Sequence, residues 1–318
     1  MRTRPASSAS DASTDETGAK PARRRRRARA SRGGEGLAFA APALLVLTVI
    51  FAIPIVQTAG FSLTDWRGGV RDANFIGLEN FARAFSDERF LTALWHNAVL
   101  LVVVPIEVLL GAFLASVLRE RIHGWRVYRF LVMVPWIISI TIAGYVWVFF
   151  LSPGGIVNGV LDAVGLGHLT RPWLAEPAFA LPAVMLVLVW RDTGFAALLF
   201  YSRLLGVEDS IYEASALDGA KRWRRLIFIE LPLLAGAIRL FVVLMSIWLF
   251  SFVFNYVYVM TGGGPGYAST VVELEIFRNA FRLSQMGYGA AISVILLVIT
   301  LPVLIVQVRL QLRSRSLS

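Results

Sequence analysis

Two ionisable side chains, Glu107 and Arg191, interrupt stretches of sequence that are otherwise almost entirely apolar. Charged groups inside an apolar layer are costly and mark ion pairs, substrate paths or proton sites. Each lies 12 residues before a basic residue that ends its stretch, Arg119 and Arg203 respectively, or about 18 Å along a helix. We therefore expect both near the middle of a membrane, with Glu107 paired to Arg191 unless the neighbouring Asp192 competes for it.

The residue types of the chain give little support for catalysis. The chain has no Cys, which excludes disulfides, thiolate metal sites and a cysteine nucleophile. The three histidines, His96, His123 and His168, lie in or beside different connections between apolar stretches, and no Ser/His/Asp set or metal-ligand spacing accompanies them. We expect no catalytic residue and no metal site on this chain.

The connection 202–232 carries the densest polar pattern of the chain, with an acidic start, a basic middle and a proline at its end. Asp209 or Ser210 can cap a short helix beginning near Ile211, and Glu213 then lies in the first turn, where the helix dipole favours a negative charge. Small residues follow Glu213 and would let the backbone of another protein approach closely. The alternative is a solvated amphipathic loop. We expect Glu230, although it lies next to Leu231-Pro232, to be a solvated loop charge.

The elements that position these residues follow from composition. Of 318 residues, 57% are hydrophobic and 16% charged, with a mean hydropathy of +0.66, whereas soluble domains have about 25% charged residues. A membrane helix needs about 20 mostly apolar residues, and the apolar runs are continuous rather than alternating. The sequence predicts an all-α membrane protein with six transmembrane helices at 37–60, 96–118, 130–151, 178–201, 235–259 and 287–308.

Basic residues give the orientation. Of the 31 Lys and Arg residues, 22 fall on the side of the amino terminus, seven on the other side and two within spans. The positive-inside rule places both termini in the cytoplasm, and the net charge of +10 then requires no nucleic-acid partner. The predicted parts are a disordered basic cytoplasmic tail (1–36), a first helix (37–60), an extracytoplasmic loop (61–95), a five-helix core (96–308) containing loop 202–232, and a cytoplasmic tail (309–318).

The loop 202–232 resembles a motif of ABC-importer permeases. In that motif Glu-Ala-Ala is followed after three residues by Gly and after nine more by Ile-x-Leu-Pro; Glu213, Ala214, Gly219 and 229–232 fall in register, and Ser215 replaces the second Ala. The chain thus resembles the inner-membrane permeases of the binding-protein-dependent, MetI-like superfamily. The resemblance implies that this loop inserts into a cytoplasmic ATPase subunit through the coupling residues Glu213, Ala214, Ser215, Asp218, Gly219 and Ala220.

Further segments are similar to the carbohydrate-uptake group of that superfamily, which includes maltose and glycerol-phosphate permeases. They occur in the order expected for the group and span about residues 37–308. These segments are 74–81 (Asn-Phe-Ile-Gly-Leu-Glu-Asn-Phe), 155–158 (Gly-Ile-Val-Asn), 190–195 (Trp followed by Thr-Gly-Phe), 260–265 (Met-Thr-Gly-Gly-Gly-Pro) and 287–292 (Gly-Tyr-Gly-Ala-Ala-Ile).

The resemblance implies a transport subunit of an ATP-driven importer in a bacterial inner membrane, moving a sugar, oligosaccharide or polyol-phosphate by alternating access. Its partners would be a second homologous permease, two ATP-binding cassette subunits, an extracytoplasmic solute-binding protein and membrane lipid. The chain would carry no cofactor, because it lacks the phosphate-binding G-x-x-x-x-G-K-S/T pattern; ATP and Mg²⁺ would bind to the partner ATPase.

Sugars stack on aromatic rings and hydrogen-bond to amides and carboxylates, so aromatic and polar residues of the spans are candidates for the substrate path. The alternative is a structural ion pair without ligand contact, and Trp95, Trp125 and Trp136 are better explained as interface anchors. The substrate-path candidates are Glu107, Trp147, Trp190, Arg191, Phe195, Asn255 and Tyr258, with Tyr256 beside them.

Three rival functions remain at this point. An amino-acid or polyamine importer is disfavoured by the Thr-Gly-Gly-Gly-Pro segment. An ion-coupled secondary transporter could use Glu107 as its proton site, but leaves the loop motif unexplained. A membrane enzyme would need a clustered polar site, which the sequence does not offer.

Overall fold

The computed structural model describes residues 39–70, 73–120 and 123–315. These residues form helices joined by loops, with one isolated antiparallel bridge between Thr64 and Phe75, so the predicted helical class is confirmed for the described part of the chain. The predicted disordered tail, residues 1–36, lies outside the described residues.

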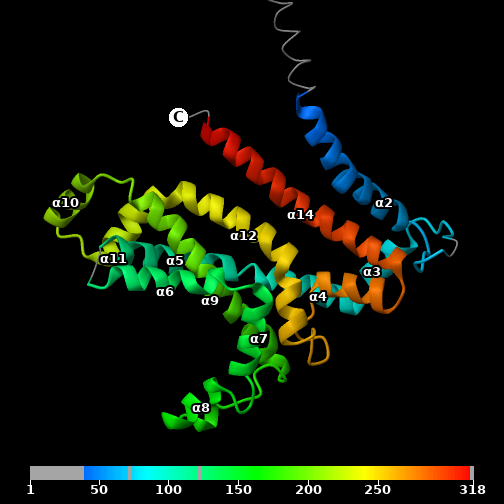
Figure 1. Cartoon of the computed structure of the whole chain (residues 1–318), viewed down its shortest axis with the longest axis horizontal. Coiled ribbons are helices and arrows are strands. Elements are labelled where there is room, and N and C mark those ends of the chain that lie inside the picture. The colour runs from blue at the N-terminus through cyan, green and yellow to red at the C-terminus, as the bar shows by residue number, and fades with distance from the viewer. Residues whose placement is uncertain (1–38, 71–72, 121–122, 316–318) are drawn as a thin grey trace, which may run out of the picture. The chain divides into compact units, whose positions relative to one another are not determined.

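The chain divides into two compact units, residues 1–56 and 57–318. In the described part of the first unit, residues 39–56 are helical and almost wholly exposed, with a π-helical turn, η1, at Thr48–Ala52. The elements that follow (Figure 1) are α2 (Ile53–Phe61), α3 (Glu79–Ser86), α4 (Glu88–Leu100), α5 (Val103–Arg119), α6 (Trp125–Ile137), α7 (Ile140–Phe150), α8 (Ile156–Ala163), η2 (Gly167–Leu169), α9 (Pro177–Leu204), α10 (Asp209–Leu217), α11 (Arg222–Arg225), η3 (Leu226–Glu230), α12 (Leu231–Met260), α13 (Val272–Phe277), η4 (Arg278–Arg282) and α14 (Met286–Arg315).

Four helices in the described residues are long and apolar enough to cross a membrane. A bent pair, α6 and α7, supplies a fifth candidate, and α14 contains a shorter apolar helix, Met286–Pro302. The six predicted stretches are therefore mostly helical where they are described, with breaks at 101–102 in the second and at 138–139 in the third, and the second helical region extends back through α4 into the predicted outer loop. The four long helices are Phe39–Phe61, Glu88–Arg119, Pro177–Leu204 and Arg222–Met260.

The prediction of one continuous helix over 130–151 was wrong. The axis turns by 101° between α6 and α7, with Ile138 and Ser139 in extended conformations between them. Pro135 lies in the last turn of α6, where its missing N–H weakens the helix. Arg191 Nε lies 3.5 Å from the Ile138 carbonyl oxygen and donates to it, which compensates for backbone groups that lipid cannot satisfy.

The contact between α5 and α9 is unusually close. A Cβ atom built on Gly111 would lie 2.4 Å from the Cβ of Ala196, and one built on Gly194 would lie 2.3 Å from the Val132 carbonyl oxygen of α6. Small residues let helix backbones approach in a membrane, where van der Waals packing drives association. The three helices α5, α6 and α9 accordingly lie side by side (Figure 1).

The glycine-rich loop between α12 and α13 is held against α4. Gly263 has a φ of +87°, and a Cβ there would lie 2.6 Å from a methyl group of Leu274. The Asn97 side-chain oxygen accepts from the Val272 N–H at 2.9 Å, and its amide donates to Glu273 at 3.2 Å. The loop therefore requires glycine for both its backbone conformation and its packing.

We expect Gly111→Ala to destabilise the protein, because the added methyl group overpacks the α5–α9 contact at a cost of about 1–3 kcal/mol. Gly236→Ala is the matched control: nothing lies within 4 Å of a Cβ at that position of α12, and Ala is favoured over Gly in a helix by roughly 1 kcal/mol. Thermal unfolding of the purified chain in detergent measures both. Equal midpoints for the two variants would contradict the close contact.

Candidate functional site

The six predicted coupling residues lie on or directly after α10. Most of them are exposed; Ser215 is buried and donates its hydroxyl to the Tyr212 carbonyl at 2.8 Å. Gly219 has a φ of +67° and ends the helix, with its N–H bonded to the Ala216 carbonyl. The exposed face of α10 and its end consists of Glu213, Ala214, Ala216, Leu217, Asp218 and Gly219, while Ala220 is half-buried.

The predicted start of this helix was two residues late. The helix begins at Asp209 with Glu208 before it, and neither supplies a side-chain cap. The Asp209 carboxylate instead accepts from Arg119 at 3.1 Å, and the Ser210 hydroxyl donates to Glu208 at 3.2 Å. The Asp209 carboxylate therefore forms an ion pair with α5 instead of capping the first turn of α10.

Arg119, the last residue of α5, anchors the start of α10. Its guanidinium donates to the Leu204 and Val207 carbonyls at 3.2 and 3.1 Å and to Asp209. It also lies over the Tyr212 ring, 3.5 Å from the ring centroid, within the range of a cation–π interaction. One side chain of α5 therefore contacts the end of α9 and the first turn of α10.

Glu120, the next residue, connects the end of α5 to the segment that precedes α12. It accepts from Arg222 and Arg225, and Arg225 also donates to Glu230 at 3.2 Å. The prediction that Glu230 is a solvated charge was wrong: its side chain is 0% exposed. Removing the partner of such a buried charge typically costs about 3–5 kcal/mol.

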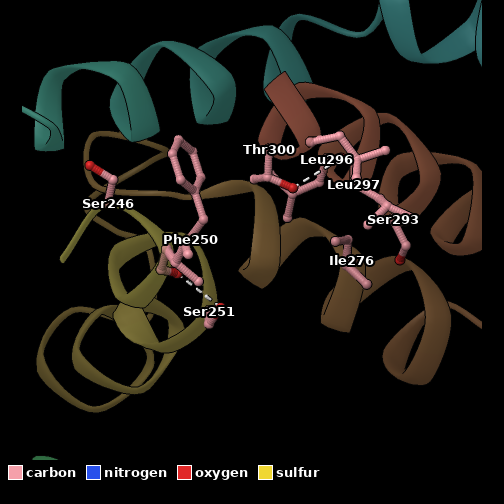
Figure 2. A pocket seen from close by; sticks show the side chains of 10 residues that line it. Ser246, Phe250, Ser251, Ile276, Ser293, Leu296, Leu297 and Thr300 are labelled. Carbon is pink, nitrogen blue, oxygen red and sulfur yellow. Dashed lines mark hydrogen bonds between the residues drawn. The ribbon is translucent and has the colours of Figure 1, made fainter. Parts of the chain in front are cut away.

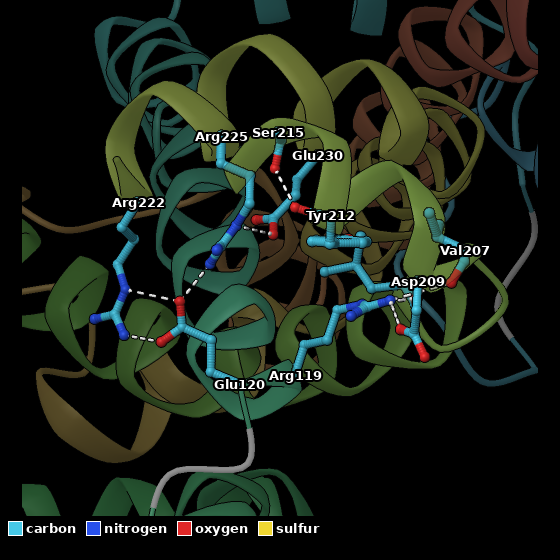
Figure 3. Close-up of polar contacts among 10 residues, drawn as sticks. Arg119, Glu120, Val207, Asp209, Tyr212, Ser215, Arg222, Arg225 and Glu230 are labelled. Carbon is cyan, nitrogen blue, oxygen red and sulfur yellow. Dashed lines mark hydrogen bonds and ion pairs between the residues drawn. The ribbon is translucent and has the colours of Figure 1, made fainter. Parts of the chain in front are cut away.

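We refer to Arg119, Glu120, Arg222, Arg225 and Glu230 as the charge cluster. Figure 3 shows Arg119 directed toward Asp209 and Tyr212, and Glu120 directed toward Arg222 and Arg225. The role of this cluster was not predicted from the sequence. The available signal was the adjacent Arg-Glu pair at the end of a predicted span, opposite a loop with four basic residues in 221–225.

Glu107 and Arg191 do not form the predicted ion pair. Arg191 instead pairs with Asp192, the alternative partner. Arg191 Nη1 lies 2.8 Å from Asp192 Oδ1, with both side chains buried. The guanidinium also lies 4.5 Å from the centroid of the Trp136 ring, so Trp136 packs inside the protein rather than anchoring an interface. Glu107 is 2% exposed, and its Oε2 has no hydrogen-bond partner among the described residues.

The other substrate-path candidates do not converge on one pocket. Trp147 and Trp190 meet edge to face at 5.5 Å between ring centroids, whereas Phe195 stacks on Trp136 at 4.7 Å. Asn255 is half-buried on α12. Tyr258 is 41% exposed and its hydroxyl accepts from Arg282 at 3.3 Å. The structure brings together two aromatic pairs and leaves two candidates on an outer face of α12.

A groove of about 310 Å³ lies between α12, α13 and α14 (Figure 2). Its hydroxyl groups already donate to carbonyls of their own helices: Ser246, Ser251, Ser293 and Thr300 do so at 2.7–3.0 Å. The remaining lining is apolar, including Phe250 and Leu296. The groove therefore fits an apolar occupant better than a sugar.

A polar cavity of about 490 Å³ lies between residues 65–67 and 76–83 on one side and residues 283–288 on the other. Arg83 crosses it, donating to Gln285 at 2.8 Å with its guanidinium 4.0 Å from the Tyr288 ring centroid. Asp65 and Glu79 also line it. This cavity joins the first predicted outer loop to the last one.

The helical bundle and the exposed helix α10 are features of a known family of membrane proteins, and a comparison with family sequences identifies it. Residues 107–316 match the family described as binding-protein-dependent transport system inner membrane component, and the chain belongs to that family. The resemblance inferred from the loop motif is thereby confirmed, and the chain is a transport permease subunit rather than an enzyme.

Particular relatives are carbohydrate permeases. The chain is 36% identical over 278 residues to the diacetylchitobiose uptake system permease protein NgcF of Streptomyces coelicolor, covering 83% of this chain and 78% of that one. It is 32% identical over 280 residues to the trehalose/maltose transport system permease protein MalF of Thermococcus litoralis, covering 86% and 92%. A bacterial ABC transporter that imports the acidic polysaccharide alginate has the same fold, with a TM-score of 0.74 over 91% of this chain and 99% of that chain at 22% identity.

The charge cluster predicts an acid-sensitive contribution to stability. Partial burial opposes ionisation of Glu120, but hydrogen bonds from Arg222 and Arg225 outweigh it and lower the pKa below the usual 4.5. Its stabilisation is present above pH 4.5 and is lost as the pH falls through the lower folded-state pKa. We expect the unfolding midpoints of wild type and Glu120→Gln to converge as the pH falls through this window.

The control is Glu120→Gln made in a chain that already carries Arg222→Gln and Arg225→Gln. There Glu120 should no longer give a higher midpoint that is lost toward low pH, because only the partial burial of Glu120 remains and burial raises its pKa. A higher midpoint with Glu120 that is lost toward low pH in this background would contradict the assignment to the two arginines.

Proposed function

We propose that this chain is the permease subunit of an ATP-driven carbohydrate importer and that α10 is the element that docks with the ATPase. The observation that carries the proposal is the exposed face of α10. Leu217 is 90% exposed and Ile211 39% exposed on a helix of nine residues, and small residues lie between them. Apolar side chains on a small-residue surface favour burial against a partner protein.

The charge cluster supports transmission of movement from α10 to the spans. Arg119 holds the first turn of α10, and Glu120 holds the segment that leads into α12. Three spans therefore have polar contacts with the loop, at the end of α9, the end of α5 and the start of α12. A displacement of α10 on ATP binding would move these helix ends together and reorient the solute path between outside and inside.

The solute is a saccharide or a glycosylated polyol under this proposal. Relatives named for diacetylchitobiose, for trehalose and maltose, and for sulfoquinovosyl glycerol support that class over amino acids or polyamines. The exposed side of α12 that carries Asn255 and Tyr258 offers an amide and an aromatic ring. We propose that this side meets the second permease and that solute passes between the two chains.

The assembly we propose has a second homologous permease, two ATP-binding cassette subunits that bind ATP and Mg²⁺, and an extracytoplasmic solute-binding protein. Six spans in a bacterial inner membrane, with both termini cytoplasmic, are consistent with the distribution of Lys and Arg. The binding protein would then face the 490 Å³ polar cavity. A relative in fold has been solved in complex with an alginate pentasaccharide-bound periplasmic protein.

An ion-coupled mechanism is the second candidate, because Glu107 is a buried carboxyl with an unpartnered oxygen. It requires uptake that survives loss of the ATPase and collapses with the proton gradient. The exposed α10 has no role in such a transporter, so we favour ATP coupling.

Leu217→Asp should abolish ATP-dependent uptake, because a charge at the centre of the docking face opposes burial against the ATPase. The unfolding midpoint should stay at the wild-type value, since this side chain contacts little of its own chain. Val164→Asp is the matched control: Val164 is 63% exposed after α8, on the predicted outer side, and its substitution should leave uptake unchanged. Uptake by inside-out and right-side-out vesicles carrying the reconstituted importer measures both; normal transport by Leu217→Asp would refute docking at this face.

Asn255→Ala should lower saccharide uptake roughly 10-fold or more, as expected when a hydrogen bond to a substrate hydroxyl worth about 1.4 kcal/mol is lost. Ser251→Ala, one turn earlier on α12, is the control, because the Ser251 hydroxyl already donates to the Ile247 carbonyl at 2.9 Å. Uptake of labelled diacetylchitobiose, trehalose and maltose provides the measurement. Equal uptake by the two variants would remove Asn255 from the solute path.

A further inference from the structure

A small void lies where α5, α9 and α12 meet. Glu107 lines it from α5, Asp192 from α9, and Trp248 and Tyr256 from α12; the rest of its wall is apolar. Its cavity volume is about 10 Å³, close to the lower limit for one water molecule. The void is thus too small for a solute and large enough for a single water.

Three unpartnered polar atoms belong to the wall of this void. They are Glu107 Oε2, Trp248 Nε1 and Tyr256 Oη, none of which has a hydrogen-bond partner among the described residues. Glu107 is 2% exposed and Tyr256 0% exposed. Buried polar groups of this kind are normally satisfied, and an ordered water is the usual means where protein groups do not meet.

The charges around the void do not balance if Glu107 is ionised. Asp192 already pairs with Arg191 at 2.8 Å, and no Lys, Arg or His bonds to Glu107 in the described part of the chain. An isolated carboxylate in an apolar interior is strongly disfavoured relative to the neutral acid. A cation in the void would restore neutrality, but the indole of Trp248 can only donate and would oppose a cation beside it.

We propose that Glu107 is a neutral carboxylic acid and that it holds one water molecule in this void. The carboxyl O–H donates to the water or to the Asp192 carboxylate, the Trp248 N–H donates to the water, and the water donates to the remaining carboxyl and phenol oxygens. Three spans are thereby joined through one neutral polar site. Separation of these spans would admit bulk water and favour ionisation of Glu107, so the site stabilises the closed arrangement.

Thermal unfolding of the purified full-length chain in nanodiscs at neutral pH tests the proposal without any partner subunit. Glu107→Gln keeps the shape and hydrogen-bonding groups of the neutral acid and should have the wild-type midpoint. Glu107→Met, of similar length but without polar atoms, should lower the midpoint by several degrees. A higher or lower midpoint for Glu107→Gln would show an ionised Glu107 and overturn the proposal, as would an unchanged midpoint for Glu107→Met.

Two measurements on the folded protein distinguish the proposed occupant from its alternatives. Infrared spectra should contain the carbonyl stretch of a buried neutral carboxylic acid in wild type, and this band should be absent from Glu107→Gln; its absence from wild type would overturn the proposal. Replacing choline chloride by sodium chloride at constant ionic strength should leave the wild-type midpoint unchanged. A sodium-dependent rise that Glu107→Gln abolishes would identify a cation and overturn the water assignment.

Discussion

The register of α5 against α9 determines where the functional groups of both helices meet. Gly111 and Ala196 approach so closely that a Cβ atom on Gly111 would not fit beside the Ala196 methyl group. This contact fixes Glu107, one turn before Gly111, near Asp192, one turn before Ala196. The same two helices end beside each other, where Arg119 donates to the carbonyl groups of Leu204 and Val207 at and just after the end of α9.

Charge is neutralised differently in the middle of α9 and at the Arg119 end of α5. Inside the helix bundle, Arg191 pairs with the carboxylate of the adjacent residue, Asp192, and its guanidinium also contacts the Ile138 carbonyl and the Trp136 ring. That arrangement couples the break between α6 and α7 to an ion pair of α9. At the Arg119 end of α5 the charges instead form ion pairs between elements distant in sequence, because side chains at exposed helix ends can reach neighbouring elements.

Much of this organisation follows from the sequence. Continuous apolar runs predict helical spans because only a helix satisfies its own backbone in lipid, and the spacing from Glu213 to Pro232 identifies the loop. The break at Ile138 could not be predicted, since a bent pair and a straight span have the same composition. The partner of Arg191 and the burial of Glu230 depend on side-chain directions and on the tertiary position of the loop, which hydropathy does not encode.

The two polar sites of α5, at Arg119 and at Glu107, differ in their exposure to water. This difference affects how the spans could move. In the charge cluster, the Arg119–Asp209 and Arg222–Glu120 ion pairs are partly exposed, whereas Glu230 is buried beside Arg225. The site at Glu107 is satisfied only while α5, α9 and α12 stay together. Under the proposed coupling, a force applied to α10 would reach α5 through the partly exposed Arg119–Asp209 ion pair and would be resisted by the buried site at Glu107. The energy needed to open that site would then set the threshold for reorientation of the spans.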